Sequence, residues 1–433
     1  MFFQEMTNLI KKAETVSRIG KIENVIGMTI EASGSKAGVG DICMISDDGK
    51  HEVMAEVVGF KDEKILLMPY AELSGIAVGN YVRNTYQKLQ IPVGDFLQGR
   101  VIDALANPID DMQDFPKGEK YTVVNKYINP LSRPTISQRL DFGLKAIDGL
   151  TTIGKGQRIG IFAGSGVGKS TLMGMIARNG KADINVIALV GERGREVREF
   201  LQKDLGEEGL KRSIVIVATS DQPAMLRMKC PMVATTIAEY FKNQGKDVLL
   251  MMDSLTRFAM AHREVGLAVG EPPVARGYTP SIYSELPKLL ERSGNFEEGS
   301  ITGIYTVLVE GDDTNEPISD TVRGIVDGHI VLSRKLAHKN HFPAIDVSSS
   351  ISRLMDSIVS QEHKQIASKM RDLMSTYQQN EDMIAIGAYK PGNNPKLDEA
   401  VSKMDAINTF LKQEIDLSFQ YDEILNQMQA IIR

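Results

Sequence analysis

One segment, residues 163–170 (AGSGVGKS), constrains the fold of this chain more than any other. It follows an apolar run, residues 157–163 (QRIGIFA), and precedes residues 171–180 (TLMGMIARNG), which have helical character. A glycine-rich turn between a buried strand and a helix is typical of a phosphate-binding loop, because backbone N–H groups and the helix N-terminus can surround phosphate oxygens. The segment therefore predicts a parallel α/β sheet with an anion site at the edge where its strands end.

The residues expected to bind nucleotide in this loop are Ala163, Gly164, Ser165, Gly166, Val167, Gly168, Lys169, Ser170 and Thr171. Lys169 is expected to reach the β- and γ-phosphates, and the Ser170 hydroxyl to ligate Mg²⁺. The usual pattern begins with glycine, whereas this chain has Ala163. Since alanine tolerates a positive φ poorly, we expect that this position does not need one.

Two carboxylates follow apolar strand-like runs and should reach the same sheet edge. Asp253 ends the run of residues 248–252, which is typical of a Walker B strand whose acid reaches the Mg²⁺ shell. Glu192 follows another such run and could orient and polarise the water that attacks the γ-phosphate. Arg193 would supply charge or hold that loop, and Arg257, one helical turn beyond Asp253, could face the phosphates.

The pattern of the chain changes twice, which predicts three domains. Short β-rich runs separated by turns occupy residues 18–92 and predict a small N-terminal β-barrel or sandwich. Residues 93–349 alternate apolar strands with helical segments, as in a P-loop domain with a parallel sheet, and the turn-rich stretches 99–111 and 129–134 are the expected junction. Residues 350–433 predict a C-terminal helical domain. Its apolar stripe is Met404, Ile407, Leu411 and Ile415, followed by Tyr421, Leu425, Met428 and Ile432.

Composition limits the classes of function and the compartment. The net charge of −6 argues against a chain dominated by affinity for nucleic acid. The longest clean apolar stretch falls far short of 18 residues, so we expect no membrane span. Cys43 and Cys230 form no C-x-x-C pair, which suits free thiols in a reducing, cytoplasmic compartment.

Several long motifs in this order resemble the rotary-ATPase-like family of hexameric P-loop ATPases. The motifs shared with that family are residues 103–110 (DALANPID) and 253–266 (DSLTRFAMAHREVG). Others look most like the flagellum-specific type III protein-export ATPases: residues 191–197 (GERGREV), 270–294, 307–337 and 377–395. The resemblance covers nearly the whole chain and implies the same three-domain order, with a β-barrel in first place.

This resemblance implies an enzyme that hydrolyses MgATP as a homohexamer and energises type III export of flagellar proteins. Within residues 341–353, Phe342 falls where the family stacks an aromatic ring on adenine, and Arg353 where it supplies an arginine finger to a neighbouring subunit. Both residue types suit these roles, since a ring beside a proline is a stiff platform and a guanidinium can neutralise phosphoryl charge.

Residues 1–17 carry apolar side chains at spacings of three and four, which predicts an amphipathic helix. It could pack on the chain's own β-domain, dock a partner, or lie on a membrane surface. Because only Lys11, Lys12 and Arg18 are basic nearby and acids oppose them, we favour a partner. The resemblance implies a regulatory stator protein at this helix, export substrates with their chaperones, and a peripheral location at the export gate, on the inner face of the cytoplasmic membrane.

Four other functions compete with this hypothesis. A non-catalytic nucleotide-binding subunit would usually lack an acid at the position of Glu192. A nucleic-acid translocase would need a basic, aromatic face that the N-terminal β region lacks. The catalytic subunit of a rotary ATP synthase is the nearest enzyme alternative, and the short helical segment after Pro395 disfavours it. An injectisome type III secretion ATPase also stays open as an alternative.

Overall fold

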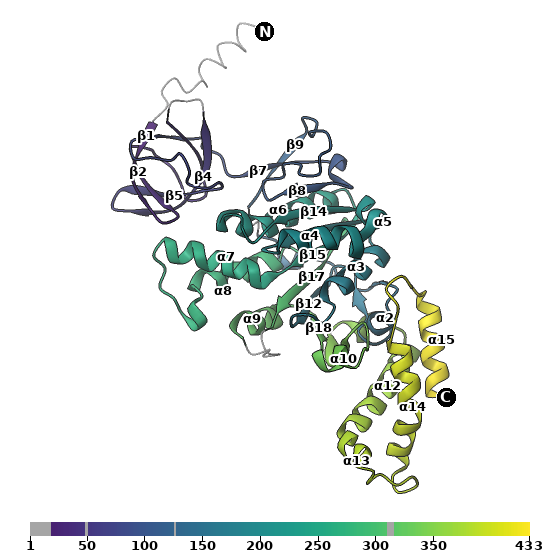
Figure 1. The fold of residues 1–433 in the computed structure, drawn as a ribbon. Helices are drawn as coiled ribbons and strands as arrows, with labels where there is room; N and C mark the ends of the chain where they lie inside the picture. The colour runs from purple at the N-terminus through teal and green to yellow at the C-terminus, as the bar shows by residue number, and fades with distance from the viewer. Residues whose placement is uncertain (1–18, 48–50, 125–126, 310–315) are drawn as a thin grey trace, which may run out of the picture.

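The computed structural model describes residues 19–47, 51–124, 127–309 and 316–433. The predicted helix of residues 1–17 lies outside these residues. A closed β-barrel and a C-terminal group of helices lie at opposite ends of a central α/β domain (Figure 1). This confirms the predicted fold class and its domain order.

The barrel is built from six antiparallel strands in the order β1-β2-β5-β4-β3-β6. Their bounds are β1 Ile19–Ile26, β2 Thr29–Ser33, β3 Ile42–Ser46, β4 Glu52–Lys61, β5 Lys64–Pro69 and β6 Tyr81–Asn84. Side chains alternate between exposed and buried along β6 and the first half of β1, as expected where one face of a strand lines a closed core. Ile22, Ile45 and Leu67 are among the residues that fill that core.

The central domain contains a nine-stranded sheet whose main path is β19-β18-β12-β17-β15-β13-β14-β8. The strands are β8 Val101–Asp103, β12 Arg158–Ala163, β13 Ile184–Val190, β14 Ser213–Ala218, β15 Asp247–Asp253, β16 Gly294–Asn295, β17 Ser300–Leu308, β18 Gly328–Leu332 and β19 Ile345–Ser352. Neighbours along the path pair in parallel except β18 and β19, which are antiparallel. The sheet therefore presents the ends of β12, β13 and β15 at one edge.

The expected domain junction at residues 99–111 is wrong in part. Residues 101–103 form β8, which pairs with β14 and belongs to the central sheet. A strand of three residues is too short to show a periodic pattern, so only its partner in space reveals it. The chain reaches β8 from the barrel through β7 Gln90–Val93, which pairs with β9 Glu119–Thr122.

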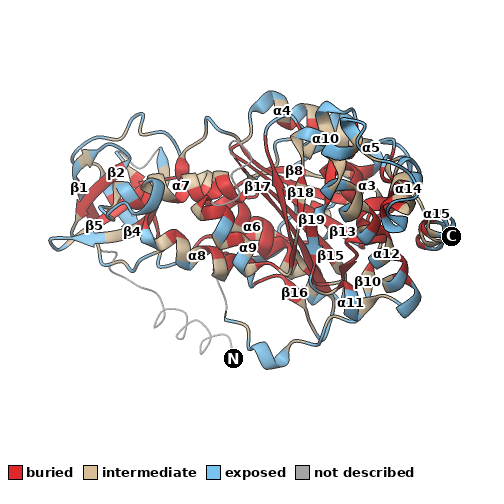
Figure 2. Cartoon of the chain, turned by 90° about the horizontal axis from the view of Figure 1, so that it is seen from below, coloured by how far each residue is buried: buried red, intermediate tan, exposed pale blue. Residues whose placement is uncertain are grey.

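Helices cover both faces of the sheet (Figures 1 and 2). Successive strand residues belong to two different cores, one on each face. In β15, Val248, Leu250 and Met252 face one core, whereas Leu249 and Met251 face the other. The first core includes side chains of α6 Ala224–Asn243, α7 Leu255–Ala268, α8 Pro280–Leu290 and α9 Pro317–Ile325. The second includes side chains of α2 Lys145–Leu150, α3 Lys169–Asn179, α4 Gly194–Glu199, and the C-terminal helices.

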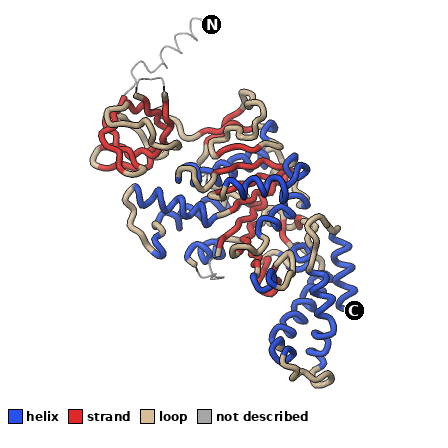
Figure 3. Tube along the Cα trace, in the orientation of Figure 1, coloured by secondary structure: helices blue, strands red, loops and turns tan. Residues whose placement is uncertain are grey.

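The C-terminal domain is helical, as predicted (Figure 3). Its helices are α11 Met355–Ile358, α12 Gln361–Gln379, α13 Glu381–Ala385, α14 Pro395–Leu411 and α15 Tyr421–Ile432. Ile415 departs from the predicted stripe: α14 ends at Leu411, and Ile415 is half exposed in the loop that follows. The spacing of apolar residues continues past the end of the helix, but the loop is hydrogen-bonded to the central domain, where the Arg178 guanidinium donates to the Ile415 carbonyl at 2.9 Å. No helix of the described ranges is both long and apolar enough to cross a membrane.

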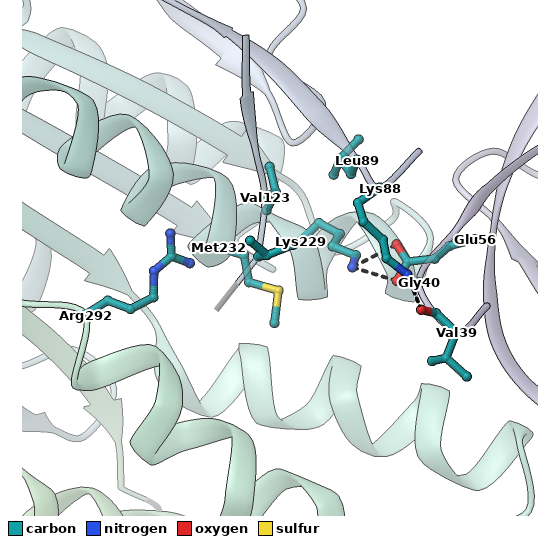
Figure 4. A pocket seen from close by; sticks show the side chains of 10 residues that line it. Val39, Gly40, Glu56, Lys88, Leu89, Val123, Lys229, Met232 and Arg292 are labelled. Atoms are coloured by element: carbon teal, nitrogen blue, oxygen red, sulfur yellow. Dashed lines mark hydrogen bonds and ion pairs between the residues drawn. The ribbon is translucent and has the colours of Figure 1, made fainter. Parts of the chain in front are cut away.

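A buried ion pair joins the barrel to the central domain (Figure 4). The Lys229 ammonium of α6 lies 2.8 Å from the Glu56 carboxylate of β4, and both residues are buried. The Tyr70 hydroxyl also donates to Glu56. Because each charge has a partner, the loss of hydration at this joint is offset.

Candidate active site

The phosphate-binding loop connects β12 to α3 as the sequence predicts. Gly166 and Gly168 have φ values of 77° and 85°, a left-handed conformation that favours glycine. Ala163 is the last residue of β12 and has no positive φ, which confirms that alanine is tolerated there. Ser165, Gly166 and Ser170 are exposed, so the loop is open to a ligand from solvent.

Lys169 forms ion pairs with both predicted carboxylates, Asp253 and Glu192. Its ammonium lies 2.5 Å from Asp253 Oδ1 and 3.3 Å from Glu192 Oε1. Asp253 ends β15 and is 4% exposed, while Glu192 lies two residues after the end of β13. Three residues more than 20 positions apart in the chain thus meet at the carboxyl edge of the sheet.

The charges of this cluster shift the pKa values of Glu192 and Lys169. Burial raises the pKa of Glu192 to about 7, and the Asp253 carboxylate adds to the rise while Lys169 opposes it. Burial alone lowers the pKa of Lys169, but Asp253 and Glu192 outweigh burial and leave that pKa above its ordinary value. Lys169 is therefore a protonated cation, and Glu192 is poised to exchange a proton near neutral pH.

The two flanking arginines differ. Arg257 lies beside the Glu192 loop, since a Cβ built on Gly191 would be 3.0 Å from Arg257 Cβ. Its Nε is buried and has no hydrogen-bond partner in the described chain, so its N–H can donate to an anion. The side chain of Arg193 is 77% exposed and lies 3.6 Å from Glu196, and it has no ion pair with the Lys169 cluster.

A cavity of about 810 Å³ adjoins the loop. Gly168, Thr171, Phe342 and the loop after α14 line it, and a Cβ built on Gly168 would be 3.6 Å from the Phe342 ring. Phe342 is 41% exposed, which leaves a ring face open to a flat ligand. The loop after α14 is hydrogen-bonded to the Phe342 side of the cavity, because the Gln413 N–H donates to the Phe342 carbonyl at 3.0 Å.

Arg353 lies at the end of the sheet opposite to the phosphate-binding loop, where β12 and β18 begin. The first residue of β19 pairs with the last residue of β18, beside Ala163 and the phosphate-binding loop. The last residue of β19, Ser352, pairs with Gly328 at the start of β18. The Arg353 N–H donates to the Asp327 carbonyl at 3.0 Å, at the far end of β12. At about 3.3 Å per strand residue, the length of β12 separates Arg353 from the loop of its own chain by roughly 16 Å or more.

Two neighbours of the site were not predicted from the sequence. The Thr306 hydroxyl of β17 donates to Asp253 Oδ1 at 2.8 Å and so orients the carboxylate. Arg334 packs against the loop, with its guanidinium 2.8 Å from a Cβ built on Gly164. Thr306 stands at the sheet edge within an apolar run, and that polar position is the only sequence signal.

Three features together define a P-loop ATPase. They are the phosphate-binding loop, the lysine shared by two carboxylates and the β-barrel that precedes the sheet in the chain. The chain matches the nucleotide-binding domain of the ATP synthase alpha/beta family over residues 143–352 and the β-barrel domain of that family over residues 22–86. Residues 359–430 match the C-terminal domain of the type III secretion ATPase EscN. The chain belongs to this family, and within it to the flagellum-specific and type III secretion ATPases.

Relatives support that placement over nearly the full length. The flagellum-specific ATP synthase of Bacillus subtilis is 55% identical over 416 residues, which cover 95% of each chain. The type 3 secretion system ATPase of Xanthomonas euvesicatoria is 46% identical over 415 residues, 96% of this chain and 94% of the relative. The assembled ATPase EscN of enteropathogenic E. coli superposes with a TM-score of 0.91 at 46% identity, covering 96% of this chain and 100% of EscN. The chain is accordingly an ATP-binding ATPase of type III export.

Proposed function

We propose that the Lys169 cluster hydrolyses MgATP and that this reaction drives the export of flagellar proteins. The observation that carries the proposal is the single ammonium bonded to both Asp253 and Glu192 at the end of a phosphate-binding loop. The higher identity to a flagellar relative than to an injectisome relative, 55% against 46%, supports the flagellar assignment.

The oxygen donors at the loop fit Mg²⁺. Asp253 offers a carboxylate held by Thr306, and Ser170 offers an exposed hydroxyl in the first turn of α3. The described residues contain no cluster of three or more His, Cys, Asp or Glu side chains, so substrate phosphates and water must complete the shell, as Mg²⁺ prefers. When bound, the ion would neutralise charge on the phosphate oxygens.

When ATP binds, Lys169 would exchange its carboxylate partner for phosphate oxygens. Phosphate oxygens compete for the Lys169 ammonium, which frees Glu192 from its ion pair. Glu192 accepts a proton from water, the water oxygen attacks the γ-phosphorus, and the bond to the β,γ-bridging oxygen breaks to release ADP. Arg257 would face the phosphates, Phe342 would stack on adenine, and Arg193 would hold the loop from its exposed side.

Lys169→Ala should weaken ATP binding by roughly 10- to 100-fold, because a hydrogen bond from a charged donor to ground-state phosphates is lost. Equilibrium binding of ATP measures the effect, and thermal unfolding checks that the variant is folded. The matched control is Lys203→Ala, whose side chain is 75% exposed. Unchanged ATP affinity in Lys169→Ala would refute the assignment of the loop.

The active assembly is proposed to be a homohexamer. Since Arg353 lies at the far sheet edge of its own chain, it can reach a nucleotide only in a neighbouring subunit. EscN has been solved as an assembled ATPase and in complex with its central stalk EscO, and this chain superposes on that complex with a TM-score of 0.89. A stalk protein inside the ring is proposed here by the same likeness.

Deleting residues 1–17 should leave folding and basal ATP hydrolysis roughly intact, because termini contribute little to the main cores unless they are tied down. The deletion should abolish binding of the regulatory stator protein and lower export of substrates and their chaperones at the membrane gate. Thermal unfolding and pull-down of the truncated chain provide the measurements. A large loss of stability with stator binding retained would instead place the helix within the fold.

A further inference from the structure

Lys145, the first residue of α2, has no role in the mechanism above and yet lines the nucleotide cavity. It is only 7% exposed, which is unusual for a lysine. Its backbone N–H donates to Gln413 Oε1 at 3.0 Å, so the loop after α14 holds the start of α2 against the cavity. A buried cation at this position needs a partner.

The partners of the Lys145 ammonium are two aromatic rings. Its Nζ lies 4.9 Å from the centre of the Phe419 ring and 5.4 Å from that of Phe410. Within the described ranges, no carboxylate or carbonyl lies at ion-pair or hydrogen-bond distance from this atom. Ring faces stabilise the charge but offer no lone pair, so N–H donors stay available to a ligand in the cavity. Burial lowers the pKa of Lys145, as expected for an ammonium that lacks a counter-ion.

The cavity walls indicate which part of a nucleotide lies there. The apolar part of the lining is formed by Leu172, Met175, Phe342, Pro343, Leu417 and Phe419, beside polar and charged residues such as Lys412, Glu414 and Asp416. Apolar and aromatic walls suit a flat base and disfavour a phosphate, which would lose its hydration without compensation. The acceptors on the rim of a purine are its ring nitrogens.

We propose that Lys145 donates a hydrogen bond to a ring nitrogen of the adenine that stacks on Phe342, a contact that rests on the proposed function. Phe410 and Phe419 come from the C-terminal domain, so that domain holds the ammonium in place and completes the base site. Lys145 and Lys169 then divide the work: Lys145 binds the base, and Lys169 binds the phosphates.

Binding of three ligands to Lys145→Met tests this division. The variant keeps an unbranched apolar stem and loses the donor. ATP and AMP should each bind about tenfold or more weakly, whereas inorganic tripolyphosphate should bind as it does to the unaltered chain. The matched control is Lys181→Met, which alters a lysine two residues after α3 whose side chain is 55% exposed, and it should change the binding of none of the three ligands. Unchanged ATP affinity, or an equal loss for tripolyphosphate, would overturn the proposal.

Deaza analogues test the same contact in the unaltered chain, without dependence on the folding of a variant. Among 1-deaza-, 3-deaza- and 7-deaza-ATP, one should bind about tenfold more weakly than ATP, and Lys145→Met should not discriminate against it. Equal binding of ATP and all three analogues would refute the Lys145 contact alone. Failure of ATP itself to bind the unaltered chain would refute the proposed function.

Discussion

Glu192→Gln is expected to lower kcat for ATP hydrolysis by about 10²- to 10⁴-fold, the usual contribution of a general base. The amide keeps the shape of the side chain but cannot accept the proton of the attacking water. ATP binding should stay largely intact, because Lys169 still meets the phosphates and loses one competing carboxylate. Steady-state phosphate release and equilibrium ATP binding separate the two effects.

A matched control comes from the same segment of the chain. Glu199 ends α4 and pairs with the exposed Arg195 at 3.0 Å, whereas the carboxylates that pair with Lys169 are Glu192 and Asp253. Glu199→Gln should therefore hydrolyse ATP normally. Full activity in Glu192→Gln would remove this carboxylate from the mechanism. An equal loss in both variants would show that the segment matters only for folding.

Arg353→Ala is expected to lower kcat by about 10³- to 10⁵-fold, the range found for arginine fingers. The structure gives a physical reason to place this effect across a subunit interface, because the length of β12 separates Arg353 from its own phosphate-binding loop. Specific activity of the unaltered chain should therefore rise with protein concentration as the ring assembles.

Mixing two inactive variants provides the decisive measurement. Arg353→Ala keeps Lys169, and Lys169→Ala keeps Arg353, so an equal mixture should contain complete sites at about a quarter of the interfaces of randomly assembled rings. Arg353→Ala mixed with the double variant should recover nothing. Specific activity independent of concentration, together with no recovery in the first mixture, would contradict action in trans.

Much of the site could be predicted because its parts are local. The loop of residues 163–170 has strand, turn and helix signals within one short segment. Asp253 and Glu192 each follow an apolar run, and parallel strands bring such positions to one edge whatever their order in the sheet. Their contacts with Lys169 at 2.5 Å and 3.3 Å confirm that they meet.

Other features depended on pairings between distant segments. β8 is recognisable only through its pairing with β14, and Ile415 lies in an irregular loop that lines the cavity beside the phosphate-binding loop. Thr306 orients Asp253 only because β17 lies beside β15. The residues next to these positions in the sequence do not indicate which distant segment each of them contacts.

The sequence by itself determined the P-loop, the class of chemistry and the three-domain order, since these follow from local spacing and the period of apolar residues. Only the tertiary structure decided whether a basic side chain lies at the end of the sheet that carries the phosphate-binding loop or at the opposite end. The antiparallel pairing of β19 carries Arg353 away from the loop that Phe342 adjoins, although only ten residues separate them. The fold likewise buries Lys145 beneath two C-terminal aromatic rings. Separation along the chain limits the distance between two residues only when they are a few positions apart. For residues further apart, the pairing and register of the strands determine that distance.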